Sequence, residues 1–512
     1  MQRAGWLRAH FMVAAAALAH VGCGGAETGT TEATPSSVVA AATLDFVTLS
    51  PDKARFVLNA SGTPFIPFGV NYDKDIRARL IEEYWVSDFA RVAQDFREMQ
   101  ALGANVVRLH IQLNRFMLSP TQPNTAALDR LQQLVELCES LGMRLLLTGL
   151  GSYRPGDQPS WYTEVTTGER WAIQAEFWRS VAARVGTSPA IFAYDLQNEP
   201  VVPDKTPFSA WTGGEICGLH FAHAVAREPD PLGAGQLAQD WVRTLSGAIR
   251  DVDERHLITV GLLPPELGSG GFSNAVLSPL VQDGLLDFLS VHVYPEANRL
   301  GTAYNAVRWH RSLARPILVE EIYTLGAAAP EVEQFMLDAL PEVAGYVGFY
   351  WGDPQTGLAP DVCPDITGAF RERVTGAQYR AWLSLLQRVG PLVKRETPPE
   401  ADLFQYWNPT QTDHFYTVER NDSLYGALGW QFERRLGGVL RYNPGGAIPL
   451  CRYWNPALTD HFYTVACRHA DMNLFGYTFE RVEGWVYPTT TTTKRPLNRY
   501  WNGNTKDHYY TT

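Results

Sequence analysis

Two glutamates lie where buried strands are expected to end. Glu199 follows the apolar run Ile191–Gln197 and is followed at once by Pro200, which cannot donate to a sheet ladder and therefore ends the strand. Glu321 ends a second apolar run that begins at Ile317. A protonated and an ionised carboxyl group on either side of a glycosidic bond can cleave it, one as proton donor and the other as nucleophile. The competing interpretation is two strand-end charges satisfied by neighbouring loops.

Polar and aromatic residues at other strand ends could support this chemistry. Arg108 and His110 share parity in their strand, so both can face a barrel interior. A neighbouring arginine lowers the pKa of a carboxylate nucleophile, and an asparagine can bond the 2-hydroxyl of a sugar. A tyrosine hydroxyl can hold an oxygen of the nucleophile, and a tryptophan face can stack on a sugar ring. The candidate substrate-binding or supporting residues are Arg108, Asn198, His292, Tyr294, Trp351 and His110.

Short apolar runs alternate with amphipathic segments along residues 44–392. Near-continuous apolar strands are typical of a parallel sheet covered by helices, and eight strand–helix units predict an α/β fold of the (β/α)8 TIM barrel type. The active site of such a barrel lies at the C-terminal ends of the strands. A doubly wound sheet is the competing fold, but it would require a glycine-rich phosphate-binding turn after an early strand, and the sequence has none. The predicted strands are 65–72, 105–111, 144–150, 191–197, 257–260, 288–294, 317–321 and 346–351.

The barrel region resembles clan A glycoside hydrolases, most closely glycoside hydrolase family 5 of the cellulase and mannanase type. The resemblance is carried by Asn198-Glu199-Pro200, by Pro316–Glu321, by Arg108 and by Phe68–Tyr72. It implies a retaining double displacement on a β-linked polysaccharide such as β-1,4-glucan or β-1,4-mannan. Glu199 would be the acid/base and Glu321 the nucleophile.

Glu321 is preferred over Glu320 on two grounds. The catalytic glutamate of the family is the second residue of this pair, and adjacent strand residues face opposite ways, so only one of the two is expected to point into the barrel mouth. The family often has histidine at the end of the third strand, where this chain has Leu147–Tyr153, and His110 could stand in for it.

Other classes of function are weighed against the hydrolase. A carbohydrate-binding surface lipoprotein with an inactive barrel is the alternative, which an intact glutamate pair disfavours. A metal-dependent barrel hydrolase would need clusters of histidine and aspartate that the strand ends lack, so neither a metal nor another cofactor is expected. The net charge of −11 argues against a nucleic-acid partner. The expected partner is a polysaccharide or oligosaccharide substrate.

The first 23 residues resemble a bacterial lipoprotein signal. Arg3 and Arg8 precede the apolar run Phe11–Ala19, which is too short to span a bilayer, and Cys23 follows a small residue. His20 stands where that pattern has leucine. The sequence therefore predicts an exported protein, extracellular or at the cell surface, and leaves lipid anchoring through Cys23 open. Residues 24–43 are rich in Ala, Thr, Ser and Gly and are expected to form a flexible linker.

A polar, proline-bearing linker at 393–402 precedes a repeat domain at 403–512. Trp407 recurs as Trp454 and Trp501 at an interval of 47 residues, and Asp-His-aromatic-Tyr-Thr recurs with the same period. The repeat predicts a smaller all-β, trefoil-like domain, because one unit cannot bury its own apolar face. The third unit reaches Thr512 before completing a period, so the domain is expected to be incomplete.

These repeats resemble a domain of unknown function found on secreted bacterial proteins. Trp407, His414 and their copies could bind sugars, but a strict repeat is also what packing demands, and the packing role is favoured. Cys451 and Cys467 are expected to form a disulfide in an oxidising compartment, whereas Cys138 is expected to be a buried thiol.

Overall fold

A computed structural model describes residues 44–512 with several gaps, so the predicted signal and linker at 1–43 lie outside the described residues. Among the helices that are described, none is long and apolar enough to cross a membrane. The gaps are 76–78, 217–218, 298, 341, 350, 353–375, 395–399, 441–446, 468–471, 473–474 and 490–493.

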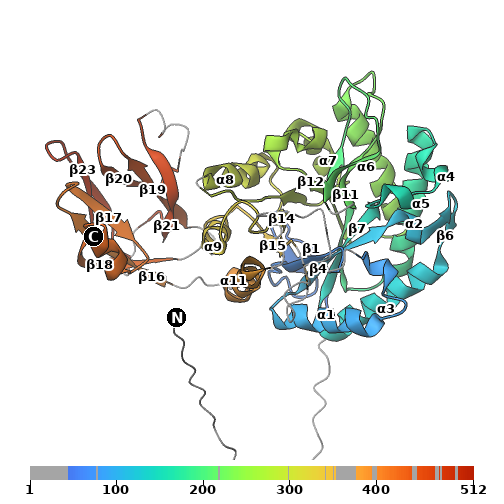
Figure 1. The fold of residues 1–512 in the computed structure, drawn as a ribbon, viewed down its shortest axis with the longest axis horizontal. Coiled ribbons are helices and arrows are strands. Elements are labelled where there is room, and N and C mark those ends of the chain that lie inside the picture. Colours follow the sequence, from blue (N-terminus) through green and yellow to red (C-terminus); the bar gives the residue numbers. More distant parts are fainter. Residues whose placement is uncertain are drawn as a thin grey trace, which may run out of the picture. The chain divides into compact units, whose positions relative to one another are not determined.

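Eight parallel strands form a closed barrel, which confirms the predicted fold (Figure 1). Each strand is buried along its length, as expected when helices cover the outside and side chains fill the inside. The eighth strand is shorter than predicted. The barrel strands are β3 (Phe68–Tyr72), β4 (Val106–Gln112), β7 (Arg144–Gly151), β8 (Ile191–Asn198), β12 (Leu257–Leu262), β13 (Leu289–His292), β14 (Ile317–Glu321) and β15 (Gly345–Gly348).

Amphipathic helices surround the barrel and bury their apolar faces against it (Figure 1). Helix α3 carries the buried thiol of Cys138 and ends at Gly142, whose φ of 67° is the left-handed conformation that closes a helix C-terminus. The long helices are α1 (Phe89–Ala101), α3 (Thr125–Leu141), α5 (Thr167–Val185), α6 (Ala234–Arg250), α7 (Asn274–Gln282), α8 (Leu300–Trp309), α9 (Ala329–Asp338) and α11 (Ala377–Val393).

A hairpin closes the N-terminal end of the barrel. Strands β1 (Val47–Leu49) and β2 (Phe56–Leu58) are antiparallel, and Phe56 meets Phe192 and Phe288 edge-on with ring centroids 5.1 and 5.0 Å away. Both partners lie at the starts of barrel strands, so the hairpin belongs to the lower core and leaves the opposite end of the barrel for a site.

Short elements build the loops of the barrel. The segment after β8 forms a sheet in the order β10–β11–β9, whose strand β9 begins at Pro200. The short elements are β5 (Met117–Ser119), β6 (Gln122–Pro123), β9 (Pro200–Val201), β10 (Thr212–Ile216), β11 (Leu219–Ala224), α2 (Leu113–Phe116), α4 (Ser160–Thr163), η1 (Ile81–Glu83), η2 (Pro155–Asp157), η3 (Pro265–Gly271) and η4 (Arg311–Leu313).

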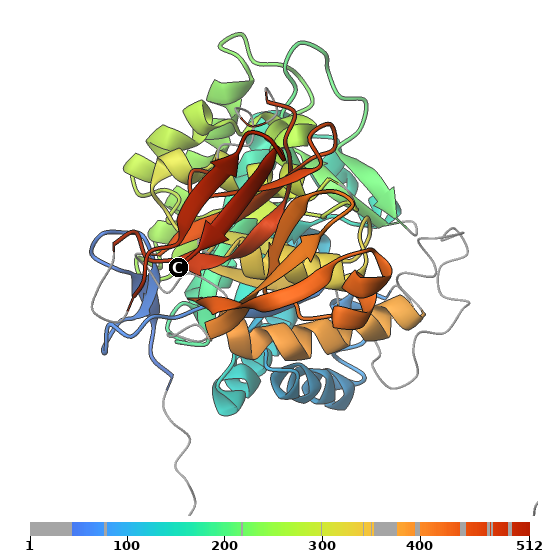
Figure 2. The ribbon, with the colours of Figure 1, turned by 90° about the vertical axis from the view of Figure 1, so that its left-hand side faces the viewer.

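The C-terminal region is antiparallel β structure, with strands from orange to red in Figure 2. Six strands form one sheet in the order β17–β16–β18–β21–β19–β20, and β22 pairs with β23 as a separate hairpin. This pairing supports the all-β prediction but does not show a trefoil. The elements are β16 (Glu400–Asn408), β17 (Asp413–Thr417), α12 (Asp422–Ala427), β18 (Gln431–Leu440), β19 (Ile448–Asn455), β20 (Asp460–Thr464), β21 (Thr478–Val486), β22 (Asn498–Asn502) and β23 (Asp507–Thr511).

The three sequence repeats contact one another in a cycle through buried aspartates. The imidazole Nδ1 of each histidine lies 2.5–2.7 Å from the aspartate of another repeat, and the histidine backbone N–H donates to the same carboxyl group. Repetition of one contact three times supports the packing interpretation of the motif. The predicted Cys451–Cys467 disulfide is present within the second repeat. The contacting pairs are His461 with Asp413, His508 with Asp460, and His414 with Asp507.

Candidate active site

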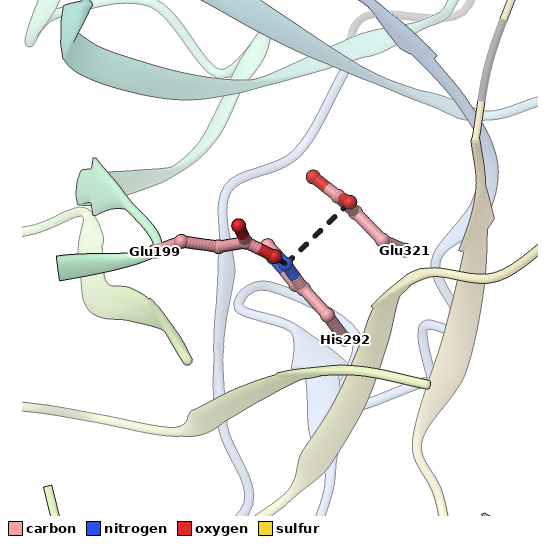
Figure 3. A group of neighbouring side chains, drawn as sticks. All are labelled: Glu199, His292 and Glu321. Carbon is pink, nitrogen blue, oxygen red and sulfur yellow. Dashed lines mark hydrogen bonds and ion pairs between the residues drawn. The ribbon is translucent and has the colours of Figure 1, made fainter. Parts of the chain in front are cut away.

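Glu199 and Glu321 meet at the C-terminal end of the barrel, with His292 between them (Figure 3). One ligand atom from each of the three side chains lies within 4.8 Å of those of the other two. His292 Nδ1 lies 2.7 Å from Oε1 of Glu199 and 3.5 Å from Oε2 of Glu321. The fold therefore brings together the two carboxyl groups that the sequence predicts at strand ends.

The backbone changes direction sharply at Glu199. Strand β8 ends at Asn198, as the following proline predicts, and Glu199 has a φ of 44°, a conformation that costs energy for a residue with a Cβ. Its N–H donates to the carbonyl of Gly261 at 3.0 Å, and its carbonyl accepts from the N–H of His223 at 3.1 Å. These two bonds hold Glu199 in a conformation that directs it over the barrel mouth.

Arg108 is the hub beneath the glutamate pair and is completely buried. Its Nη1 donates to Glu321 at 2.7 Å and to Asn71 at 2.9 Å, and its Nη2 donates to Asp195 at 2.7 Å and to Asn198 at 2.8 Å. A planar guanidinium can serve several acceptors in fixed directions, which an ammonium cannot. The predicted inward orientation of Arg108 is confirmed.

Tyr294 and Arg108 hold the two oxygens of Glu321 separately. The Tyr294 hydroxyl donates to Oε2 at 2.5 Å, while Arg108 donates to Oε1. Burial raises the pKa of Glu321, and Glu199 raises it further, whereas His292 and Arg108 act in the opposite direction. The expected lowering of this pKa by the arginine is therefore present but is outweighed by burial.

His292 is surrounded by carboxyl groups. Burial lowers its pKa, but Glu321, Glu199 and Glu320 together raise the pKa of His292 to about 10. It is therefore an imidazolium at neutral pH, able to donate from both ring nitrogens. The imidazolium partly offsets the negative charge that the glutamates place at the barrel mouth.

Glu320 also faces the barrel interior, so the expectation that only one of the two adjacent glutamates can do so is wrong. Its carboxyl group lies 3.5 Å from Nε of Arg108 and 3.5 Å from Nε2 of His292. The pairing with β13 shifts register here, from Val291 with Val319 to His292 with Glu321, and this irregularity breaks the strict alternation of side chains. Burial would raise the pKa of Glu320, but Arg108 and His292 lower it below its usual value.

Two other predicted residues, His110 and Trp351, are both buried but have different neighbours. Nε2 of His110 lies 3.0 Å from Oδ1 of Asn71, an oxygen that can only accept, and Nδ1 of His110 contacts the hydroxyl of Tyr153, which follows the third strand where the family often has histidine. Burial, followed by Arg108, holds the pKa of His110 well below its usual value, so it is neutral. Trp351 is only 3% exposed and its indole approaches Asp95 of α1, a placement that favours packing over sugar stacking.

Asn198 supports the charge cluster. Its side-chain oxygen accepts from Arg108, and its side-chain nitrogen donates to the carbonyl of Phe221 at 3.0 Å. One amide hydrogen remains for a sugar hydroxyl, so the predicted contact with the substrate stays a prediction.

Several residues of the site are not among those predicted from the sequence. Asp195 accepts from Arg108, from Thr148 at 2.8 Å and from the N–H of Gly261 at 2.7 Å, and burial raises its pKa to about 7. An acidic residue inside an apolar strand was an available signal. Gly261 was another, because a Cβ there would meet the carboxylate of Glu320 at 2.6 Å. His223 lies in a loop segment, for which the sequence offers no comparable signal.

The site also has a metal-compatible spacing. Glu199, His292 and Glu321 present three ligand atoms that could hold a cation, although the Nδ1 of His292 already contacts Glu199. No metal is expected from the sequence, and that expectation stays a prediction.

The barrel and the C-terminal region each match a family model. The family model described as cellulase, glycosyl hydrolase family 5, matches residues 58–333, and a domain of unknown function matches residues 402–512. Mannan endo-1,4-beta-mannosidase A of Podospora anserina is 25% identical over 278 residues, 48% of this chain and 65% of that protein. The chain thus matches just under two thirds of the length of this curated relative.

Two solved structures are similar to this chain at low sequence identity. An exo-beta-1,4-mannosidase from Opitutaceae bacterium strain TAV5 is 19% identical with a TM-score of 0.48, covering 69% of this chain and 64% of that chain. A beta-1,4-D-mannanase from Cryptopygus antarcticus is 13% identical with a TM-score of 0.48, covering 68% and 94% respectively. The family model spans more than half of the sequence, and the chain therefore belongs to the cellulase family, glycosyl hydrolase family 5.

Proposed function

We propose that the chain hydrolyses a β-1,4-linked polysaccharide, mannan in preference to glucan, with retention of anomeric configuration. The observation that carries this proposal is the pairing of Glu199 with Glu321. Carboxyl groups of retaining enzymes are about 5–5.5 Å apart, whereas inverting enzymes need about 6.5–9.5 Å to admit a water molecule. Oxygens within 4.8 Å of one another favour retention.

In the first step, Glu321 attacks the anomeric carbon while Glu199 protonates the leaving oxygen. Arg108 and Tyr294 each bind one oxygen of Glu321, so its carboxylate is oriented before the substrate arrives. Arg108 is itself fixed by Asp195 and Asn198, which prevents it from following the nucleophile as charge is transferred. The result is a nucleophile held in one orientation by buried groups.

In the second step, Glu199 must act as a base toward water. Nδ1 of His292 lies 2.7 Å from Oε1 of Glu199, on the side of Glu199 that faces Glu321. This contact holds the carboxyl group of Glu199 in one place, where it can receive a proton from an attacking water molecule. His292 is therefore a positioning residue for Glu199 in both steps.

The preference for mannan rests on the relative in Podospora anserina, whose name specifies a mannan endo-1,4-beta-mannosidase. A reducing-sugar assay on mannan, glucomannan, carboxymethyl cellulose and xylan tests the substrate class. We expect Glu321→Ala to abolish hydrolysis without unfolding the barrel, and Glu333→Ala on the outer helix α9 to leave it intact. Proton NMR should detect the β-anomer first, and initial release of the α-anomer would contradict retention.

Export is proposed on the signal-like pattern of residues 1–23. Cell fractionation with palmitate labelling of the wild type and of Cys23→Ser tests export and lipidation separately. Binding of these polysaccharides without turnover would instead favour the alternative function, a carbohydrate-binding surface protein with an inactive barrel.

A further inference from the structure

Strand β11 holds the last residue of strand β8 and the residue after it by three hydrogen bonds. The side-chain nitrogen of Asn198 donates to the carbonyl of Phe221 at 3.0 Å. Nδ1 of His223 lies 3.2 Å from the carbonyl oxygen of Asn198, and the backbone N–H of His223 donates to the carbonyl of Glu199 at 3.1 Å. One residue, His223, therefore contacts the backbone carbonyls on both sides of the α-carbon of Glu199.

These two contacts restrain both backbone dihedral angles of Glu199. The carbonyl of Asn198 and the N–H of Glu199 belong to one peptide plane, and the carbonyl of Glu199 belongs to the next. The N–H donates to the carbonyl of Gly261 at one edge of the first plane, and the ring of His223 contacts the opposite edge. Because both planes are held, φ and ψ of Glu199 are set, and the direction of its Cα–Cβ bond follows from them.

The backbone of Glu199 needs such restraint because it is strained. Its φ of 44° lies in the left-handed region, which is unfavourable for a residue with a Cβ and persists only where the surroundings impose it. Without the contact from the His223 ring, the first peptide plane could rotate toward a more favourable φ, and the carboxyl group would move with it. A displacement of about 1 Å at a reacting group can lower a rate by about 100-fold.

The ring of His223 is held in a single tautomer. A carbonyl oxygen can only accept, so Nδ1 donates to Asn198, and a backbone N–H can only donate, so Nε2 accepts from Ser152 at 3.3 Å. His223 is fully buried, and burial lowers its pKa to about 4, so the ring stays neutral and keeps this acceptor. Tyr153 packs against the ring with centroids 5.5 Å apart. The donor to Asn198 therefore has a fixed direction.

We propose that His223 is a positioning residue for the acid/base Glu199, and that it acts by holding the backbone on both sides of Glu199 without touching the substrate. The proposal rests on the proposed retaining hydrolysis and adds a residue to it. His292 has a different role, because it contacts the carboxyl group of Glu199 and not its backbone. Loss of the His223 contact should therefore impair the steps in which Glu199 transfers a proton.

Substrates with different leaving groups separate proton transfer from the rest of the reaction. Mannopentaose needs a proton from Glu199 at its leaving oxygen, whereas the dinitrophenolate of 2,4-dinitrophenyl β-mannobioside leaves without one. In both cases Glu321 attacks the anomeric carbon, and the electron pair of the broken bond stays on the leaving oxygen. A misplaced Glu199 should slow the first substrate selectively, whereas general damage to the fold should slow both.

Two amide variants of His223 form a matched pair. In His223→Asn the side-chain nitrogen can take the place of Nδ1 and keep the bond to Asn198, whereas in His223→Gln the amide reaches the place of Nε2 and loses that bond. We expect His223→Gln to lower kcat/KM at least about tenfold for mannopentaose and less than about threefold for the dinitrophenyl substrate. His223→Asn should stay within about threefold of the wild type on both substrates. His223→Met fills the volume of the ring without either bond and should show the same selectivity as His223→Gln, so the test does not depend on one variant.

Added azide tests the second step. Azide needs no base to attack the anomeric carbon of the glycosyl-enzyme, and as its bond forms, the bond to Glu321 breaks and returns its electron pair to the carboxylate. The product is a β-mannobiosyl azide, which mass spectrometry detects. We expect azide to raise turnover of the dinitrophenyl substrate by Glu199→Ala and by His223→Gln, and to leave turnover by the wild type almost unchanged.

His256→Gln is the control at a distance from the site. His256 is also a buried histidine, and it contacts Asp253 through Nδ1 at 2.7 Å and the carbonyl of Ser188 through Nε2 at 3.0 Å, directly before strand β12 begins. We expect this variant to change the melting temperature without changing the ratio of kcat/KM between the two substrates.

The outcomes separate this inference from the proposed function. An equal loss on both substrates in His223→Gln, or the same loss in His223→Asn as in His223→Gln, would overturn the positioning role while leaving the hydrolase intact. A Glu199→Ala variant that shows neither leaving-group selectivity nor azide rescue would overturn the acid/base assignment itself. Failure to hydrolyse any β-mannoside would overturn the proposed function and this inference with it.

Discussion

Replacement of Arg108 by methionine should destabilise the barrel and disable the site together. The variant leaves Asp195, Glu320 and Glu321 buried without the cation that lies 2.7–3.5 Å from all three. Removing one partner of a buried ion pair costs about 3–5 kcal/mol. At about 2 °C per kcal/mol for a large domain, the melting temperature should fall by about 6–10 °C. Loss of the bond to Glu321, about 1.5–3 kcal/mol, should lower kcat/KM about 10- to 150-fold.

The loss of stability should depend on pH. Without Arg108 the folded-state pKa values of Asp195 and Glu321 rise further above their unfolded values near 4, and the pKa of Glu320 rises from its lowered value, so the folded state binds more protons than the unfolded state above that pH. Stability then falls as pH rises from about 4 through the raised folded pKa values. The difference between wild type and variant should therefore be small at pH 4 and larger at pH 8, as measured by thermal unfolding at each pH.

Arg144→Met is the matched control for this prediction. Arg144 is also a buried arginine on a barrel strand, but it lies at the opposite end, where it donates to the carbonyl of Asp45 and stacks 4.7 Å from the ring of Phe65. Among the described residues, its removal leaves no buried carboxylate without an ion-pair partner. An equal, pH-independent loss of stability in both variants, or full activity of Arg108→Met, would refute the reasoning.

Three further predictions concern other parts of the molecule. Tyr294→Phe should lower kcat/KM about 10- to 150-fold with little change in melting temperature, because it removes one charge-assisted bond to Glu321, and steady-state kinetics with calorimetry would measure both. Reduction of Cys451–Cys467 should destabilise the C-terminal domain by about 3 kcal/mol, measured by denaturant unfolding with and without dithiothreitol. Burial first, and then two neighbouring aspartates, raise the pKa of Asp413 to about 8. Because this folded-state pKa lies above the unfolded value near 4, the stability of the C-terminal domain should fall as pH rises from about 4 to 8. Asp413→Asn should flatten this fall in thermal unfolding measured at each pH, and an unchanged pH profile of stability would contradict the prediction.

The predicted site agrees with the structure where side-chain direction follows from strand parity, and departs from it where parity is broken. Arg108 faces the interior as its parity in β4 predicts. Glu320 was expected to face away from the interior, and the register shift beside it turns it inward. Trp351 lies just past the end of β15, where the strand pattern no longer constrains direction, and its indole approaches Asp95.

The sequence by itself determined the eight strands, their order and the two glutamates at their ends, because apolar runs, prolines and strand ends are local signals read within a few residues. Only the tertiary structure decided that Asp195 and Glu320 share Arg108 with Glu321, and that His223 contacts the carbonyls of Asn198 and Glu199. These contacts join residues far apart in the chain. Their geometry depends on barrel closure and strand register, which no single stretch of sequence encodes.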